Sequence, residues 1–186
     1  VSLGLIVDLS YKNPHLSPFD EMQRWKHHPL IAEVLEGGER VSYGARALSK
    51  GGLQALPKLT VPGALIVGDD AGFLNPLKIK GSHTAMKSGM LAAEAVFDEI
   101  SQGHAQTNAT TFQSRFENSW LYDELNRARN VGPALHKLGM LGGSGYAFAD
   151  QFFAGNQPWT LTDPTPDYAT LTPAASCTPL AYPNPH

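Results

Sequence analysis

The chain has 186 residues, a formal charge of −3 and one cysteine, Cys177. This length suffices for one domain or two small ones, and the weak negative charge provides no basic surface of the kind that nucleic-acid binding requires. A single thiol cannot form an internal disulfide and cannot alone hold an iron–sulfur cluster or a structural zinc ion.

The N-terminal part of the chain predicts two strands and two helices. Residues 1–9 alternate enough to form a strand. Ser17 and Pro18 begin a helix, because proline fits the first turn of a helix, and the next proline breaks it. Residues 30–35 add one or two helical turns, which end at a glycine pair. Residues 40–46 predict a second strand with a glycine irregularity.

The most informative pattern follows. Residues 65–67 form a short apolar run, as expected for a strand buried on both faces. Gly68 ends this strand, so Asp69 stands at its carboxyl end, where open α/β sheets bind ligands. After a loop, Ser82 or Thr84 can cap a helix, and the start of a helix gathers free N–H groups.

Helices dominate the remainder of the prediction. The helix after residue 81 should run to Gly103, with a core-facing apolar stripe at steps of four and three residues. The stripe comprises Met86, Met90, Ala93, Phe97 and Ile100. A second helix should open at Thr110 or Thr111, run to Leu125 and be followed by a break at residues 130–133. Residues 134–154 predict an apolar, glycine-rich helix or helix pair, and the proline-rich residues from Gln157 onward predict little regular structure.

The order of strand, Gly68-Asp69, loop and helix start favours a flavin site. A carboxylate can accept hydrogen bonds from ribityl hydroxyls, and a helix N-terminus can stabilise negative charge on a reduced ring. The alternative is a turn in which the aspartates hydrogen-bond their own backbone. Lys78 and Lys80 could stabilise the flavin, attract an acidic partner or be solvated loop residues, and His83 could donate a proton or serve as a structural hydrogen-bonding group.

The apolar segment at residues 135–159 also allows two interpretations. Its aromatic and glycine residues suit a surface that dips into a bilayer or lines an apolar ligand channel, and they equally suit an ordinary buried helix. The chain contains no uncharged apolar run of the roughly 18–20 residues that a membrane-spanning helix needs.

Other chemistries find no support in the sequence. The adjacent His27 and His28 would point about 100° apart on a helix, so they cannot readily chelate one metal. The phosphate-binding pattern G-x-G-x-x-G after a strand is absent from these residues. We therefore expect an internal fragment of a longer protein. Residues 1–9 look like a strand already in progress, and residues 179–186 look like a linker cut short.

Residues 73–89, with the sequence FLNPLKIKGSHTAMKSG, closely resemble the family of electron transfer flavoprotein–ubiquinone oxidoreductases. Further resemblance extends in order along almost the whole chain: YKNP at 11–14, QRWKHHP at 23–29, LEGG at 35–38, YGARAL at 43–48, PKL at 57–59, PWTL at 158–161 and CTP at 177–179. The resemblance is weakest between about residues 101 and 157.

This resemblance implies an α+β fold, made of part of a glutathione-reductase-like FAD domain and part of a quinone-binding domain. Residues 1–48 would belong to the quinone-binding domain and residues 49–105 to the C-terminal part of the FAD domain. Residues 106–186 would form a helical, membrane-facing region and an extended linker. The family's upstream FAD fingerprint, quinone-facing glycine pair and C-terminal 4Fe-4S domain would lie outside this chain, and Cys177 matches a position that is not a cluster ligand.

The resemblance further implies an oxidoreductase of the respiratory chain. It would pass electrons from reduced electron transfer flavoprotein through FAD and a 4Fe-4S cluster to ubiquinone, bound to a bacterial or mitochondrial inner membrane without spanning it. The alternatives are another FAD-dependent oxidoreductase, of the geranylgeranyl reductase or aromatic hydroxylase type, or a fragment that is inactive when isolated.

Two sets of residues carry these expectations, and neither includes a metal ligand or an acid–base catalyst. The cofactor set comprises Gly68, Asp69, Gly72, Gly81, Ser82, His83 and Thr84. The quinone- and membrane-facing set comprises Leu138, Met140, Leu141, Tyr146, Phe148, Phe152 and Phe153. Asp150 and Gln151 are more polar than the family resemblance would lead us to expect in this second stretch.

Overall fold

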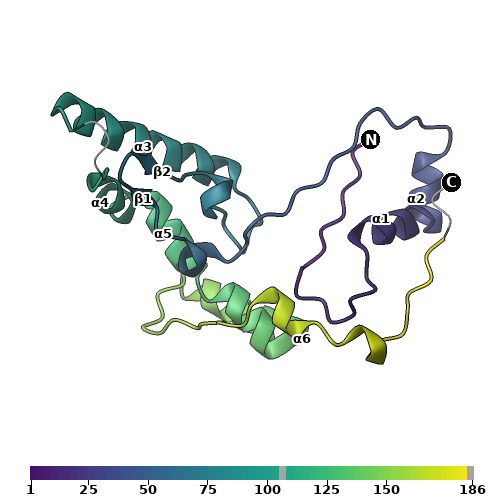
Figure 1. Ribbon diagram of the computed structural model, residues 1–186. Helices are drawn as coiled ribbons and strands as arrows, with labels where there is room; N and C mark the ends of the chain where they lie inside the picture. The colour runs from purple at the N-terminus through teal and green to yellow at the C-terminus, as the bar shows by residue number, and fades with distance from the viewer. Residues whose placement is uncertain (105–107, 184–186) are drawn as a thin grey trace. The chain divides into compact units, whose positions relative to one another are not determined.

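The computed structural model describes residues 1–104 and 108–183. The chain divides into a first unit, Val1–Ala45 with Pro164–His186, and a second unit, Arg46–Asp163. The expected boundary between residues 105 and 106 lies outside the described residues. The described elements are mostly helical with one β-hairpin, which is compatible with an α+β fold (Figure 1).

The first unit contains α1 (Pro18–Lys26) and α2 (Pro29–Leu35), as the sequence predicts. The Ser17 hydroxyl caps α1 by accepting a hydrogen bond from the Asp20 N–H at 3.3 Å. Proline occupies the first turn of both helices, so Pro29 begins α2 as well as ending α1. Tyr182 from the C-terminal segment donates its hydroxyl to Glu21 at 3.1 Å.

The two strands predicted in this region are wrong. Residues 1–9 and 40–46 have no regular secondary structure, and most of their side chains are exposed. A strand is stable only when its backbone N–H and C=O groups pair with a neighbouring strand. Within the described residues neither segment has such a partner, so alternation of apolar residues alone does not produce a strand here.

The predicted buried strand at residues 65–67 is also wrong. The structure has a two-stranded antiparallel hairpin of β1 (Thr60–Val61) and β2 (Ala64–Leu65), with Thr60 opposite Leu65 and Val61 opposite Ala64. Ile66 follows β2 and is exposed. Since β2 pairs only with β1 among the described strands, no larger sheet covers its two faces.

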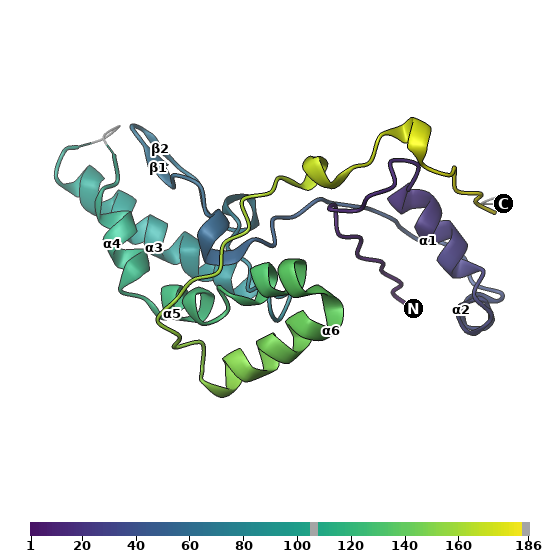
Figure 2. The same ribbon diagram turned by 90° about the horizontal axis from the view of Figure 1, so that it is seen from below.

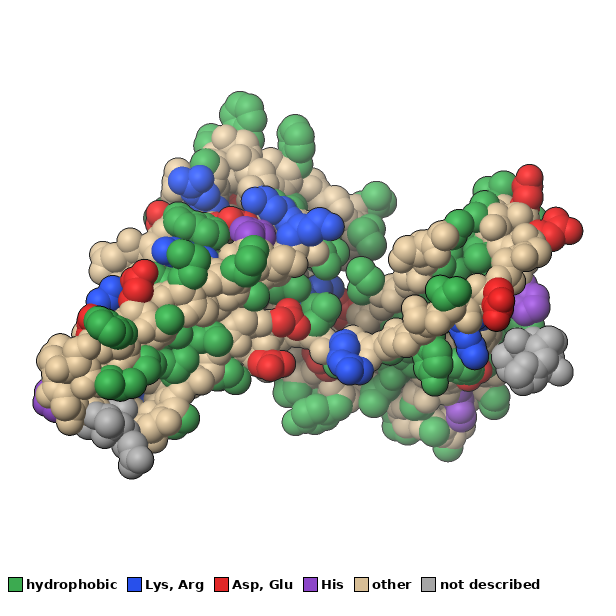
Figure 3. All heavy atoms as spheres, turned by 90° about the horizontal axis from the view of Figure 1, so that it is seen from above, with side chains coloured by type: hydrophobic (Ala, Val, Ile, Leu, Met, Phe, Trp, Pro, Cys, Tyr) green, Lys and Arg blue, Asp and Glu red, His purple; other side chains and the backbone are tan. Residues whose placement is uncertain are grey.

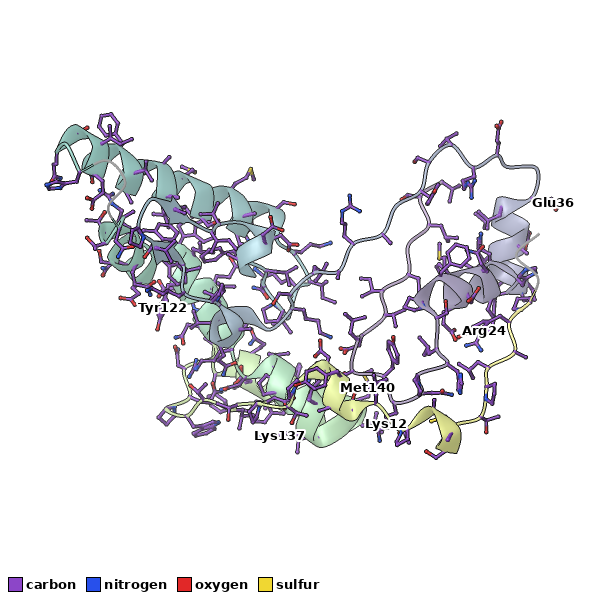
Figure 4. The ribbon with its side chains drawn as sticks, in the orientation of Figure 1. Lys12, Arg24, Glu36, Tyr122, Lys137 and Met140 are labelled. Carbon is purple, nitrogen blue, oxygen red and sulfur yellow. The ribbon has the colours of Figure 1, made fainter. Side chains whose placement is uncertain are left out.

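The core of the second unit lies between α3 (Ser82–Ser101), α4 (Thr111–Glu117) and α5 (Trp120–Arg127). Four side chains from the two shorter helices are fully buried: Phe112, Phe116, Leu121 and Leu125. Phe73 joins them, with its ring edge-to-face against Phe116 at 5.2 Å between centroids. Figure 4 shows the side chains crowded between these helices around the labelled Tyr122, which packs against the core.

The apolar stripe predicted to face the core on α3 is exposed instead. Met86, Met90, Phe97 and Ile100 are each more than half exposed, and Ala93 is exposed as well. Hydrophobic side chains accordingly gather over this part of the surface in Figure 3. The buried face of α3 carries smaller residues, among them Ser88, Ala92 and Ala95, because these allow α4 and α5 to approach closely.

The predicted helix from residue 110 to Leu125 is two helices. Ser119 has an extended backbone, with φ −107° and ψ 157°, which separates α4 from α5. The break expected at residues 130–133 falls slightly earlier, at residues 128–130, between the end of α5 at Arg127 and the start of the next helix at Val131. α6 (Val131–Phe152) includes Pro133 in its first turn, where the missing N–H is not needed. Gly139, at φ 70° and ψ −178°, divides α6 into the two limbs that Figure 2 shows, so the expected helix pair is confirmed.

Candidate functional site

The turn after β2 is built by two glycines with positive φ angles. Gly68 has φ 70° and ψ −153°, a conformation essentially restricted to glycine, and Gly72 has φ 89°. Between them Asp69–Ala71 form a short 3-10 turn, closed by the Gly72 N–H donating to the Asp69 carbonyl at 2.8 Å. The Asp69 side chain is exposed, so its carboxylate is accessible to a ligand.

A hydrogen bond joins this turn to α3. The Gly68 N–H donates to the Ser88 hydroxyl at 2.9 Å, and that hydroxyl donates to the Ala85 carbonyl at 2.7 Å. This contact places the Asp69 turn beside the first two turns of α3. The two parts of the predicted flavin site, a carboxylate and a helix N-terminus, are therefore neighbours.

The start of α3 has no side-chain cap, which corrects the prediction that Ser82 or Thr84 caps it. Gly81 is the N-cap residue, and no side chain within residues 1–104 and 108–183 accepts a hydrogen bond from the first N–H groups of the helix. Ser82 is exposed. The uncapped N–H groups and the partial positive charge of a 20-residue helix can together stabilise negative charge on a ligand.

Thr84 is buried and acts within the protein. Its hydroxyl lies within hydrogen-bonding distance of the Phe73 carbonyl and of the Gly81 carbonyl, the latter at 2.8 Å. It thereby ties the loop before α3 to the first turn of that helix. Asn75 closes the same loop, because its N–H donates to the Lys80 carbonyl at 3.0 Å.

Glu124 on α5 is a polar residue of this region that no sequence motif indicates. Its Oε1 atom accepts from Asn75 Nδ2 at 2.8 Å, Lys78 Nζ at 3.1 Å and His83 Nε2 at 2.9 Å. The His83 ring also stacks on Trp120, with 6.1 Å between centroids. No spacing in the sequence links Glu124 to a loop more than 40 residues earlier, because only the tertiary fold brings α5 there.

The pKa of Glu124 reflects these contacts. Burial by itself would raise the pKa, but hydrogen bonds from His83, Asn75 and Lys78 outweigh burial and lower it to about 2. Glu124 is therefore ionised near neutral pH. Its negative charge lies 3.1 Å from the Lys78 ammonium group, so this lysine forms an ion pair within the protein.

The exposed surface of α6 contains most of the second predicted set. Leu138, Met140, Leu141, Phe148, Phe152 and Phe153 are each more than half exposed, with Leu141 at 91%. Tyr146 is only partly exposed, and its hydroxyl accepts the Trp159 indole N–H at 2.9 Å. Figure 4 labels Met140 and Lys137 on this helix.

Asp150 does not interrupt this apolar surface. It is 2% exposed and so lies on the inner side of α6, while the neighbouring Gln151 donates to the Arg127 carbonyl. The loop after α6 is held by Arg129, which donates to the carbonyls of Gly155 and Gln157. The buried Asp150 thus lies away from the exposed Phe and Leu side chains, whereas Gln151 is exposed and hydrogen-bonds to the protein backbone.

Each unit also has a hollow on its surface. In the first unit, a hollow of about 400 Å³ is lined by Leu5, Glu21, Arg24, Trp25, His27 and His28. In the second unit, a hollow of about 430 Å³ lies between the second limb of α6 and the loop that follows it, beside Tyr146, Phe153 and Trp159. The described residues contain no helix long and apolar enough to cross a membrane, and no group of three metal-ligating side chains.

Comparison with known proteins decides the family. Residues 1–48 match the family model described as "ETF-QO, ubiquinone-binding". All of this chain aligns, at 54% identity over 187 residues, with 34% of the electron transfer flavoprotein–ubiquinone oxidoreductase of Pseudomonas aeruginosa. It aligns at 49% identity over 192 residues with 31% of the human mitochondrial protein of that name.

The chain belongs to the family of electron transfer flavoprotein–ubiquinone oxidoreductases. A protein of Acinetobacter baylyi, named as a probable electron transfer flavoprotein–ubiquinone oxidoreductase, is 55% identical to this chain over 188 residues. That alignment covers 92% of this chain and 33% of the Acinetobacter protein. The chain spans about a third of the length of these relatives. The resemblance inferred from the sequence is confirmed.

Proposed function

We propose that the protein containing this chain transfers electrons from reduced electron transfer flavoprotein to ubiquinone. This chain would supply the ribityl and ring side of an FAD site and part of the ubiquinone-binding region. The observation that carries the proposal is the match of the entire chain to bacterial and mitochondrial relatives of that name. The exposed Asp69 carboxylate and the uncapped start of α3 support it, because they stand together.

The residues present fit one half of FAD. The Asp69 carboxylate would accept hydrogen bonds from ribityl hydroxyls, and the N–H groups at Ser82, His83 and Thr84 would lie beside the isoalloxazine ring. Gly68 and Gly72 would allow the positive φ angles of the turn that presents Asp69, and Gly81 would let the chain pass close to Leu74 at the start of α3. When bound, FAD supplies the capacity to accept and release electrons singly, and the protein orients it and tunes its potential.

The rest of the proposal concerns the other parts of the protein, the domains to which this chain contributes and the exposed surface of α6. The ADP end of FAD and the ligands of a 4Fe-4S cluster would come from other parts of the protein, in which residues 49–105 complete a glutathione-reductase-like FAD domain. Residues 1–48 would form part of the quinone-binding domain. The exposed side chains of α6 would bind the surface of a bacterial or mitochondrial inner membrane near the quinone entrance.

Quinone reduction assays test the proposed function. The complete protein, purified with its cofactors, should reduce a soluble ubiquinone analogue when supplied with reduced electron transfer flavoprotein, and omission of the flavoprotein should abolish the reaction. If NADPH with an isoprenoid or aromatic substrate supports turnover and electron transfer flavoprotein does not, the protein is instead a geranylgeranyl reductase or hydroxylase. We expect the isolated 186-residue chain to be colourless and inactive.

A further inference from the structure

Three side chains from the loop and helix start beside the proposed flavin site meet at one carboxylate oxygen. Asn75 and Lys78 belong to the loop before α3, and His83 is the second residue of α3. The acceptor, Glu124, lies on α5 and is mostly buried, with 19% of its side chain exposed. The contact therefore connects the predicted cofactor residues to a helix that neither the sequence motif nor the proposed function includes.

The hydrogen bond to Glu124 determines the state of the His83 ring. A carboxylate can only accept, so Nε2 of His83 must carry the hydrogen in this contact. In the neutral ring Nδ1 is then the unprotonated nitrogen. Stacking of the ring on Trp120, with 5° between the planes, restricts its rotation. Two residues of one helix, Trp120 and Glu124, thus fix both the tautomer and the orientation of His83.

Lys78 provides the countercharge at the same oxygen. Its ammonium group is 3.1 Å from Glu124 Oε1 and its side chain is more than half exposed, whereas the His83 side chain is 39% exposed. Asn75 further restrains the loop, because its Oδ1 accepts the N–H groups of Leu77 and Lys78 while its Nδ2 donates to Glu124. The loop and the ring are consequently held by the same acceptor.

We propose that Glu124 is a positioning residue for the flavin site, acting through His83. It holds the imidazole with Nε2–H directed to α5, so that Nδ1 is the nitrogen available to the cofactor side of the loop. This inference rests on the proposed function, since it assumes that residues 68–84 face FAD. Glu124 is remote in sequence from residues 68–84, and it would influence the electrostatic environment of the flavin ring without touching the flavin.

A double-mutant cycle on the complete flavin-containing protein tests this role. The variants are Glu124→Ala, His83→Ala and the pair together, and the measurement is the flavin midpoint potential by spectroelectrochemistry. We expect Glu124→Ala to shift the potential when His83 is present and to have little further effect in the His83→Ala background. Equal shifts in both backgrounds, or no shift in either, would overturn the proposal.

Two further variants distinguish a positioning role of Glu124 from a general effect of its substitution on folding. Glu124→Gln keeps an acceptor for His83, so it should shift the potential less than Glu124→Ala does; an equal or larger shift contradicts a positioning role. Glu117→Ala, on the exposed surface of α4, should leave the potential unchanged. If Glu124→Ala does not fold, the same cycle is run with Glu124→Gln, whose shift must vanish in the His83→Ala background.

A second readout is independent of electron transfer. In the protein depleted of flavin, His83 should react faster with diethyl pyrocarbonate, followed by peptide mass spectrometry, in Glu124→Ala than in the wild type. An unchanged rate contradicts the proposed contact. Failure of the proposed function looks different, because the wild-type protein would then bind no FAD or reduce no quinone, whatever the behaviour of Glu124.

Discussion

At the residue scale, two threonines in the second unit differ in whether their buried hydroxyl groups make hydrogen bonds. The Thr84 hydroxyl is buried and hydrogen-bonds to the Phe73 and Gly81 carbonyls, which ties the loop to α3. The Thr111 hydroxyl is also buried, yet it has no hydrogen-bond partner within the described residues. Their replacement by valine, which has nearly the same shape, should therefore have opposite consequences.

We expect Thr84→Val to lower the free energy of unfolding of the protein by about 1–3 kcal/mol, because the Phe73 carbonyl loses the hydroxyl donor, whereas the Gly81 carbonyl keeps the Ala85 N–H. Thr111→Val should leave the stability unchanged or raise it, since it removes an unpaired polar group. Urea unfolding followed by tryptophan fluorescence measures both. Equal losses in the two variants would show that the Thr84 hydrogen bonds do not stabilise the loop.

The lowered pKa of Glu124 predicts a specific dependence of stability on pH. The folded-state pKa of about 2 lies below the usual value of 4.5, so the ionised carboxylate stabilises the folded state above pH 4.5. This contribution should be lost as the pH falls from 4.5 towards 2. The difference in unfolding free energy between the wild type and Glu124→Gln should therefore be constant near neutral pH and shrink across that acidic window. A difference that stays constant down to pH 2 would contradict the contacts of Glu124.

At the scale of elements, α6 presents its apolar residues outward mainly along the second limb, after the bend at Gly139. The side chains of Leu141 and Phe148 are 91% and 78% exposed, and the bend at Gly139 separates Leu141 from the first limb. Because Asp150 is on the inner side, no charge of that residue reaches this surface. These features favour an interfacial helix, in which apolar side chains enter the headgroup region of a bilayer.

We expect Leu141→Glu to weaken binding of the complete protein to phospholipid vesicles by roughly tenfold or more, because a leucine side chain contributes about 1.5–3 kcal/mol when it leaves water. Vesicle co-sedimentation measures the partition. Gln113→Glu adds the same charge on the exposed side of α4 and should leave binding unchanged. Unaltered binding of Leu141→Glu would exclude α6 from the membrane contact.

The helices could be predicted from the sequence because their signals are local, whereas the strands could not because they depend on distant partners. Local signals located α1 and α2, because Ser17 and the two prolines act within one helical turn. Local signals also located α3 and the divided α6. The strands at residues 1–9 and 40–46 were wrong, since strand formation depends on a partner elsewhere in the chain, and apolar alternation does not reveal that partner.

The packing direction of α3 was wrong for a related reason. Periodicity identifies an amphipathic helix, but it does not say which face meets the neighbouring helices. The bulky Met86 and Phe97 suggested the core-facing side, whereas α4 and α5 pack on the side that carries Ser88 and Ala92. Likewise, consecutive residues predicted the glycine turn at Gly68–Gly72, but they could not indicate Glu124, because its partners are distant in sequence.

At the scale of the whole molecule, this chain would supply half of the proposed cofactor site. Residues 68–84 supply a carboxylate and an uncapped helix start, and the chain spans about a third of the length of its relatives. The G-x-G-x-x-G pattern that binds the pyrophosphate of FAD is not among these 186 residues. The proposed division of labour predicts that FAD retention by the complete protein depends on Asp69.

Measurement of the FAD content of Asp69→Ala in the complete protein tests this claim most directly. Asp70→Ala is the matched control, since it removes a neighbouring exposed carboxylate from the same turn. After dialysis and gel filtration, the ratio of flavin to protein absorbance should be much lower in Asp69→Ala than in the wild type and unchanged in Asp70→Ala. A wild-type flavin ratio in Asp69→Ala would contradict the assignment of this turn to the flavin site.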